Sequence, residues 1–231
     1  MPAFVPPVTP VAWAPSYRIV PSRFPPIQLF ERVARPEDLD AVFTVEALTN
    51  TRLRDEAGDL RLVPPDERVT GPGASWLMAP FTHLSVPGGR FSTPFFGAYY
   101  AARDQATAEA ETIHHRERFL AATRQPPIEI DMRVIQATLR AELHDIRGMQ
   151  ATVPQLYDRD DYAASQAFAT RLRAARSRGI AWDSVRRDGG ECAAVFSPSS
   201  LADARQGAHL TYVWDGTRIV TVYEKSELRT P

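Results

Sequence analysis

The sequence predicts an α+β fold whose core is a mixed, largely antiparallel β-sheet flanked by helices. Strand-like segments cluster in the last part of the chain, close enough in sequence to pair locally. Helix-like segments are interspersed among them without the strict alternation of a doubly wound sheet. The pair Asp215-Gly216 between two strand-like segments is typical of a β-hairpin, which adds an antiparallel pair.

The length and composition indicate one domain preceded by a short arm. At 231 residues and 44% apolar content, the chain is sufficient for a single sizeable core. Residues 1–16 are apolar and proline-spaced, which favours an arm laid over the surface. Residues 17–231 are then expected to form a single domain, because no internal repeat, low-complexity tract or linker divides them.

In the first half, four segments follow the arm. Residues 17–20 are predicted to form a short strand. Pro36 and the acids after it indicate the start of a helix running to about Leu53. Residues 55–73 are charged and rich in Pro and Gly, which predicts a loop. Residues 76–81 form a short apolar run and are predicted to be a buried strand.

In the second half, helices and strands alternate irregularly. Asp104 is suited to cap a helix that runs to about Thr123. Residues 128–143 alternate apolar and polar, but the parity changes at Ile135-Gln136, which predicts a bulge or bend. Asp160-Asp161 opens another helix, which Gly179 ends. The remaining predicted strands cover residues 180–182, 192–196, 209–214 and 219–223.

Charge and cysteine content exclude several classes of function. Twenty-seven basic and 28 acidic residues leave a net charge of -1, so neither direct nucleic-acid binding nor adhesion to an anionic membrane is expected. Cys192 is the only cysteine, which excludes an intrachain disulfide and argues against a Cys-based zinc site. No apolar run approaches the ~20 residues of a membrane span. We expect a cytoplasmic protein.

Three residues between positions 90 and 111 suggest a ligand site. Arg90 follows two glycines, which let a backbone approach a ligand, and a guanidinium binds phosphate bidentately. Tyr100 lies in a short apolar segment, where it and Tyr99 face opposite sides of a strand. Glu111 shares a helix face with Ala108. A cation, an aromatic ring and a carboxylate suit a dinucleotide; the alternative is a loop arginine, a core tyrosine and a solvated glutamate.

Ser184 and the adjacent histidines His114 and His115 are the other candidate site residues. Ser184 follows a predicted strand without the Gly-x-Ser-x-Gly signature of a hydrolase nucleophile, so a hydroxyl that hydrogen-bonds a ligand is the better interpretation. His114 and His115 point about 100° apart on a helix and are not expected to share a metal; His115 is expected to pack in the structure.

Arg90 in Gly-Gly-Arg-Phe-Ser, Tyr100 eleven residues before Glu111, and Ser184 in Ala-Trp-Asp-Ser-Val-Arg-Arg resemble the RES domain family, named for an Arg, a Glu and a Ser. The resemblance extends from about Tyr17 to Tyr223. Its spacing selects Glu111 over Glu109, and Tyr100 over Tyr99.

This resemblance implies an ADP-ribosyltransferase-like fold and a bacterial toxin that destroys NAD+ by phosphorolysis or hydrolysis of the nicotinamide–ribose bond. Glu111, Arg90 and Ser184 would be catalytic, and Tyr100, Arg90 and Ser184 would contact the substrate. It implies no metal or cofactor, with inorganic phosphate as an alternative co-substrate. The implied partner is a cognate Xre-like helix-turn-helix antitoxin, with a homodimer inside that complex as an open alternative.

One segment departs from the family pattern. Pro94-Phe95-Phe96 stands where a small, flexible loop is expected, and a stiff, bulky loop there could narrow the cleft, alter the choice of substrate or reflect lost activity. Two alternatives therefore stay open: ADP-ribosyl transfer to a macromolecule, and a catalytically silent nucleotide- or partner-binding protein of the same fold.

Overall fold

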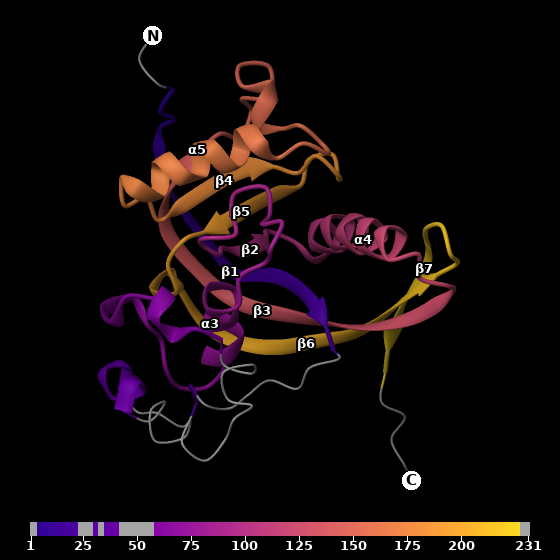
Figure 1. Ribbon diagram of the computed structural model, residues 1–231, viewed down its shortest axis with the longest axis horizontal. Helices are drawn as coiled ribbons and strands as arrows, with labels where there is room; N and C mark the ends of the chain where they lie inside the picture. The colour runs from indigo at the N-terminus through magenta and orange to yellow at the C-terminus, as the bar shows by residue number, and fades with distance from the viewer. Residues whose placement is uncertain (1–3, 23–29, 32–34, 42–57, 227–231) are drawn as a thin grey trace.

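Seven strands and three α-helices make up the part of the chain that the computed structural model describes, residues 4–22, 30–31, 35–41 and 58–226 (Figure 1). The strands are β1 (Val8–Pro21), β2 (Tyr99–Ala102), β3 (Ile128–Asp145), β4 (Gly179–Asp183), β5 (Glu191–Val195), β6 (Leu201–Trp214) and β7 (Ile219–Lys225). The α-helices are α3 (Ala74–Thr82), α4 (Gln105–Ala122) and α5 (Ala163–Ala174). Short 3-10 helices cover Pro36–Asp38, Leu60–Leu62, Pro65–Glu67, Pro154–Leu156 and Pro198–Ser200.

The strands form one strongly bent sheet in the order β1-β2-β5-β4-β3-β6-β7. Because β1 also pairs with β3, the pairings β1–β2–β5–β4–β3–β1 close a circuit, and β6 and β7 extend from it. Every pairing is antiparallel except that of β3 with β4. The predicted α+β class, with a mixed and largely antiparallel sheet flanked by helices, is confirmed.

The predicted N-terminal arm is wrong from residue 8 onward. Residues 8–16 are the first half of β1, which pairs with β3 along its whole length. Val11 and Trp13 are buried, and the register shifts between Trp13 and Ser16. Proline is tolerated because β1 has a neighbour on only one side there; its pairing with β2 involves Tyr17 alone. The predicted strand at residues 17–20 is the second half of the same element.

The predicted irregularity in residues 128–143 is confirmed within a single long strand. β3 shifts register against β6 between Arg133 and Ile135 and again between Gln136 and Thr138. Met132 and Val134 belong to one core cluster, whereas Ile135 and the apolar residues after it belong to a second. The change of parity in the sequence marks the point at which the buried side chains of β3 pass from one core cluster to the other.

The predicted strand at residues 76–81 is wrong, because this run lies in α3. Gly73 precedes the helix with φ +80°, a conformation that favours glycine. Most of α3 is buried, including Leu77 and Met78. A helix buried on most sides has no polar face, so its short apolar run looks like a buried strand.

The other predicted elements fall close to their expected places. The helix predicted from Pro36 starts with Pro36–Asp38 and continues to position 41, and the rest of its range lies outside the described residues. Asp104 caps α4 and Thr123 follows its end. Gly216 has φ +103° in the turn between β6 and β7. In the described part of the chain, no helix is both long and apolar enough to span a membrane.

Each helix covers a different part of the sheet (Figure 1). α5 lies over β4, α3 packs on β6 and β2, and α4 packs against β1 and β2. This arrangement places one face of α4 opposite the loop that precedes β2.

Candidate active site

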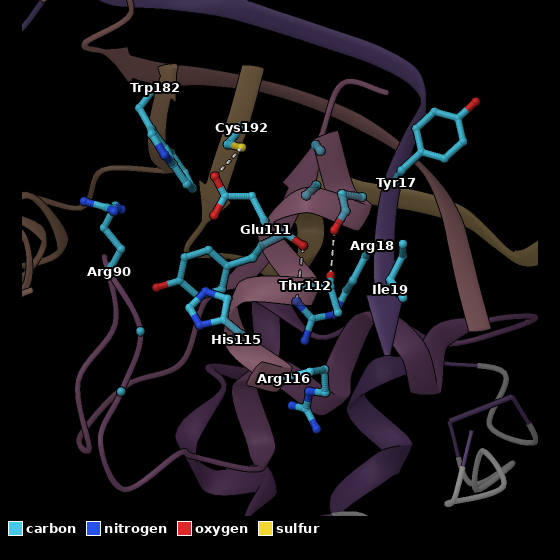
Figure 2. A pocket seen from close by; sticks show the side chains of 16 residues that line it. Tyr17, Arg18, Ile19, Arg90, Glu111, Thr112, His115, Arg116, Trp182 and Cys192 are labelled. Carbon is cyan, nitrogen blue, oxygen red and sulfur yellow. Dashed lines mark hydrogen bonds between the residues drawn. The ribbon is translucent and has the colours of Figure 1, made fainter. Parts of the chain in front are cut away.

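A pocket of about 250 Å³ opens between α4 and the sheet (Figure 2). Its walls come from β1, the turn at Gly88–Arg90, β2, α4, β4 and β5. Three of the four predicted site residues line it: Arg90, Tyr100 and Glu111.

Helix α4 contributes one continuous face to the pocket. The lining residues Ala108, Glu111, Thr112, His115 and Arg116 recur at helical spacing. Ala108 is buried against the sheet, which turns this face inward. Glu111, which the sequence places on the same helix face as Ala108, is therefore turned toward the pocket.

The Glu111 carboxylate is held by one of its oxygens. The Ser184 hydroxyl donates to Oε1 at 2.6 Å, and the Cys192 thiol lies 3.9 Å from the same oxygen (Figure 2 draws the thiol contact). Among the described residues no hydrogen bond reaches Oε2. Glu109 instead accepts from Gln105 at 2.9 Å and does not line the pocket. Of the two glutamates, Glu111 is therefore the one at the site.

Ser184 reaches the site through Glu111. Its Oγ accepts from the backbone N–H groups of Arg186 and Arg187, both at 3.1 Å, and donates to the carboxylate. Because the Ser184 oxygen already accepts two hydrogen bonds and its proton is donated to Glu111, the hydroxyl serves to orient the carboxylate. The sequence predicted a hydroxyl that contacts the ligand; in this geometry Ser184 does not line the pocket.

Arg90 is a buried cation that forms no salt bridge with any of the described residues. The residue is only 5% exposed. Its Nη1 donates a hydrogen bond to the Leu156 carbonyl at 3.0 Å, and its guanidinium lies over the Tyr162 ring, 4.7 Å from the centroid. Desolvation lowers the pKa of Arg90, and Tyr162 and Glu111 partly offset it. Nη2 is buried and has no hydrogen-bond partner among the described residues. This donor suits an anionic oxygen of a ligand.

Tyr100 supports the turn that carries Arg90. Its hydroxyl accepts from the Phe91 N–H at 2.8 Å and donates to Ser92 Oγ at 3.0 Å. A Cβ on Gly89 would lie 2.6 Å from the same hydroxyl, so only glycine allows this approach. Burial raises the pKa of Tyr100 to about 12, which keeps the hydroxyl protonated. As predicted, Tyr99 is buried in the core and Tyr100 faces the pocket.

Among the pocket residues that the sequence did not anticipate, three carry a nitrogen donor: Arg18, Arg116 and Trp182. Arg18 donates to the Tyr100 carbonyl at 3.2 Å and lies over the Tyr99 ring at 5.1 Å. The Trp182 ring meets Tyr100 edge-on at 6.2 Å, and its buried Nε1 has no partner among the described residues. Of the three, only Arg116 has a local signal that could have placed it at the site, because it follows Ala108 and Thr112 at intervals of four residues on the same helix.

The two histidines differ in their surroundings. His114 Nε2 lies 2.7 Å from Arg186 Nη2. His115 is exposed and lines the pocket, so its predicted packing is wrong: this face of α4 borders the pocket and not the core, and Phe119 one turn later is also exposed. Desolvation first, and neighbouring positive groups second, lower both pKa values to about 4. No group of three or more His, Cys, Asp or Glu side chains in the described residues is arranged to hold a metal.

The loop that departs from the family pattern lies away from the pocket. Phe95 is 85% exposed, and Phe96 is buried against Phe196 at 5.9 Å. None of residues 92–97 lines the pocket. The expectation that this loop narrows the cleft is therefore wrong, because Phe96 packs on the neighbouring core and Phe95 is exposed outside the pocket.

Comparisons with known proteins agree with the sequence resemblance. The model of the RES domain family matches residues 65–215. The chain is 31% identical over 212 residues to the uncharacterized protein y4oC of Sinorhizobium fredii, covering 90% of this chain and 86% of that protein. A chain in the crystal structure of the M. tuberculosis MbcT-MbcA toxin-antitoxin complex is similar with a TM-score of 0.48 and 12% identity, over 90% of this chain and 87% of that one.

The family match covers more than half of the chain and includes Arg90, Tyr100, Glu111 and Ser184, and the relative matches nearly the whole length. The chain belongs to the RES domain family.

Proposed function

We propose that this protein cleaves the bond between nicotinamide and ribose in NAD+, with inorganic phosphate or water as the acceptor. The observation that carries the proposal is the Glu111 carboxylate, held through Oε1 by Ser184 inside a pocket that also contains Arg90 and Tyr100. Membership of the RES domain family supports the same activity.

The residues fit the demands of this reaction. As the C1′–N bond breaks, its electron pair goes to the ring nitrogen, so nicotinamide leaves neutral and positive charge develops on the ribose. A fixed carboxylate stabilises that charge more in the transition state than in the ground state. A strong general acid is not required, which agrees with a site built around one carboxylate.

The remaining groups bind and orient the substrate. The free Nη2 of Arg90 and the free Nε1 of Trp182 are donors for phosphate or ribose oxygens. The aromatic faces of Tyr100 and Trp182 border the space for a flat ring. With phosphate as acceptor the products are nicotinamide and ADP-ribose 1″-phosphate; with water they are nicotinamide, ADP-ribose and a proton.

The physiological role that follows is that of a cytoplasmic toxin neutralised by a cognate Xre-like helix-turn-helix antitoxin. Covering the pocket is the simplest way to neutralise such an enzyme. A homodimer within that complex is compatible with this role.

Incubation of the purified protein with NAD+, with and without phosphate, tests the activity. Release of nicotinamide only with phosphate identifies phosphorolysis, and release without it identifies hydrolysis. Label from the ADP-ribose moiety retained on a protein identifies ADP-ribosyl transfer. Binding without turnover identifies a silent binding protein and overturns the proposal.

Expression in cells tests the role. Wild type and Glu111→Gln are each expressed without a partner. We expect growth arrest and falling NAD+ in the wild type only. Equal growth and steady NAD+ in both strains, with soluble protein confirmed, would overturn the toxin assignment.

A further inference from the structure

Arg116 is a pocket-lining cation to which the reaction above assigns no part. It lies five residues after Glu111 on α4, and Glu111, Thr112 and His115 line the same pocket (Figure 2). Five residues correspond to roughly 7.5 Å along a helix axis. Arg116 is therefore placed more than one turn beyond the carboxylate, on the same wall of the pocket.

The Arg116 guanidinium is desolvated and lacks an acidic partner. Nε is buried without a hydrogen-bond partner, and no carboxylate in the described part of the chain forms a salt bridge with it. The guanidinium lies 5.6 Å from the centroid of the Phe119 ring, and Tyr212 acts to raise its pKa. Burial lowers its pKa, with no carboxylate offsetting that effect. A partly buried, unpaired guanidinium is costly unless an anion completes its surroundings.

The pocket as a whole has an excess of positive charge. Arg18, Arg90 and Arg116 all line it, and Glu111 is its only carboxylate. Three guanidinium groups against one carboxylate leave an excess of two positive charges. None of the three forms a salt bridge within the described residues, so the excess is available to a ligand.

The cations divide into two groups around the carboxylate. The charge of Glu111 raises the pKa of Arg90, so Arg90 is within electrostatic reach of the carboxylate. Figure 2 shows Arg90 on one side of Glu111, and Arg18 and Arg116 on the other. In NAD+ the pyrophosphate carries two negative charges and is separated from the reacting carbon by the length of one sugar.

We infer that Arg116, together with Arg18, binds the pyrophosphate of the substrate and makes this pocket select dinucleotides over unphosphorylated nicotinamide riboside. This inference rests on the proposed function for its choice of substrate. Arg90 then serves the reacting end, beside Glu111, and Arg116 is a specificity-determining residue.

The test compares Arg116→Gln and Arg116→Lys with the matched control Arg140→Gln, which removes an exposed arginine of β3 outside the pocket. Two measurements are made: kcat/KM for NAD+ and for nicotinamide riboside, and calorimetric binding of inorganic pyrophosphate. Charge-assisted hydrogen bonds of this kind correspond to about a 10- to 100-fold effect. Circular dichroism and Tm establish that each variant is folded.

We expect Arg116→Gln to lower kcat/KM for NAD+ and the affinity for pyrophosphate by about 10-fold or more, with cleavage of nicotinamide riboside changed less than about twofold. Arg116→Lys should recover part of both losses, and Arg140→Gln should match the wild type.

Two results would overturn the inference: unchanged pyrophosphate binding in Arg116→Gln, or an equal loss for NAD+ and the riboside. Absence of measurable pyrophosphate binding by the wild type would overturn it as well. If the wild type cleaves neither substrate, the proposed reaction fails, and the pyrophosphate titration by itself decides the role of Arg116.

Discussion

At the scale of single residues, the site depends on one carboxylate oxygen being fixed and the other being left to the pocket. Ser184 and Cys192 both approach Oε1 of Glu111, so the carboxylate has a defined orientation before any ligand binds. Preorganised charge of this kind acts without reorganisation at the moment of reaction. Glu111 and Ser184 thus form one functional unit, although 73 positions separate them.

Glu111→Gln should lower NAD+ turnover about 100-fold or more, because it removes the charge opposite the developing oxocarbenium while keeping the size of the side chain. Nicotinamide release under saturating NAD+ measures it. Glu109→Gln is the control and should stay near wild type, since Glu109 bonds to Gln105 outside the pocket. If Glu109→Gln lost activity and Glu111→Gln did not, the catalytic carboxylate would be Glu109 and not Glu111.

Ser184→Ala should lower kcat about 10-fold with little change in KM, because the loss of one charge-assisted hydrogen bond leaves Glu111 less well oriented. Since Ser184 acts through Glu111, the same substitution should have almost no further effect in a Glu111→Gln background. A full additional loss in the double variant would mean that Ser184 contacts the substrate itself.

At the scale of elements, α4 is the element that carries the site, and its first turn is held by Asp104. The Asp104 carboxylate accepts from Thr107 N and from Thr107 Oγ1, both at 2.9 Å, and forms a salt bridge with Arg187 at 3.5 Å. Thr107 is fully buried, so this cap joins the start of the helix to the loop after Ser184.

Asp104→Ala should lower the stability by about 1 kcal/mol, the usual contribution of an N-cap side chain. For a domain of this size the expected fall in Tm is roughly 2–4 °C, measured by calorimetry or circular dichroism. Asp104→Asn keeps an acceptor at the cap and should lose much less. A fall of equal size in both variants would assign the effect to the salt bridge instead.

Sequence patterns predicted the elements whose periodicity is local and failed where tertiary context decides. Asp104, the alternation of β3 and the Asp215-Gly216 turn are local signals, and all three were confirmed. β1 was missed because its prolines look like breakers unless the free side of the strand is known. Arg18 was missed because it reaches the pocket only through tertiary structure: nothing in the sequence near position 18 shows that β1 will lie beside β2.

At the scale of the whole molecule, His114 and His115 on α4 bind protons more weakly in the folded protein than in the unfolded chain. The pKa values of His114 and His115 are both lowered from 6.5 to about 4. Between these two values the unfolded chain binds more protons than the folded protein, so the free energy of unfolding must decrease as the pH falls. Above pH 6.5 the effect is absent.

We therefore expect Tm to fall as the pH is lowered from about 6.5 to about 4, and to fall less in the double variant His114→Gln/His115→Gln. Thermal melts at pH 7 and pH 4.5 on both proteins measure the difference, and carboxylates common to the two cancel in the comparison. Identical pH dependence in both would show that these histidines titrate normally in the folded state.

The pairing of β1 with β3 also determines how late during translation the pocket can form. Arg18 leaves the ribosome early, but the residues that hold its strand, at positions 132–144, follow more than a hundred residues later, and Cys192 at the pocket floor comes later still. Closing so long a loop has an entropic cost that only the completed sheet repays. A nascent chain accordingly has no assembled pocket until β5 has emerged. Under the function proposed above, the site that consumes NAD+ would therefore be completed only in the last stage of translation.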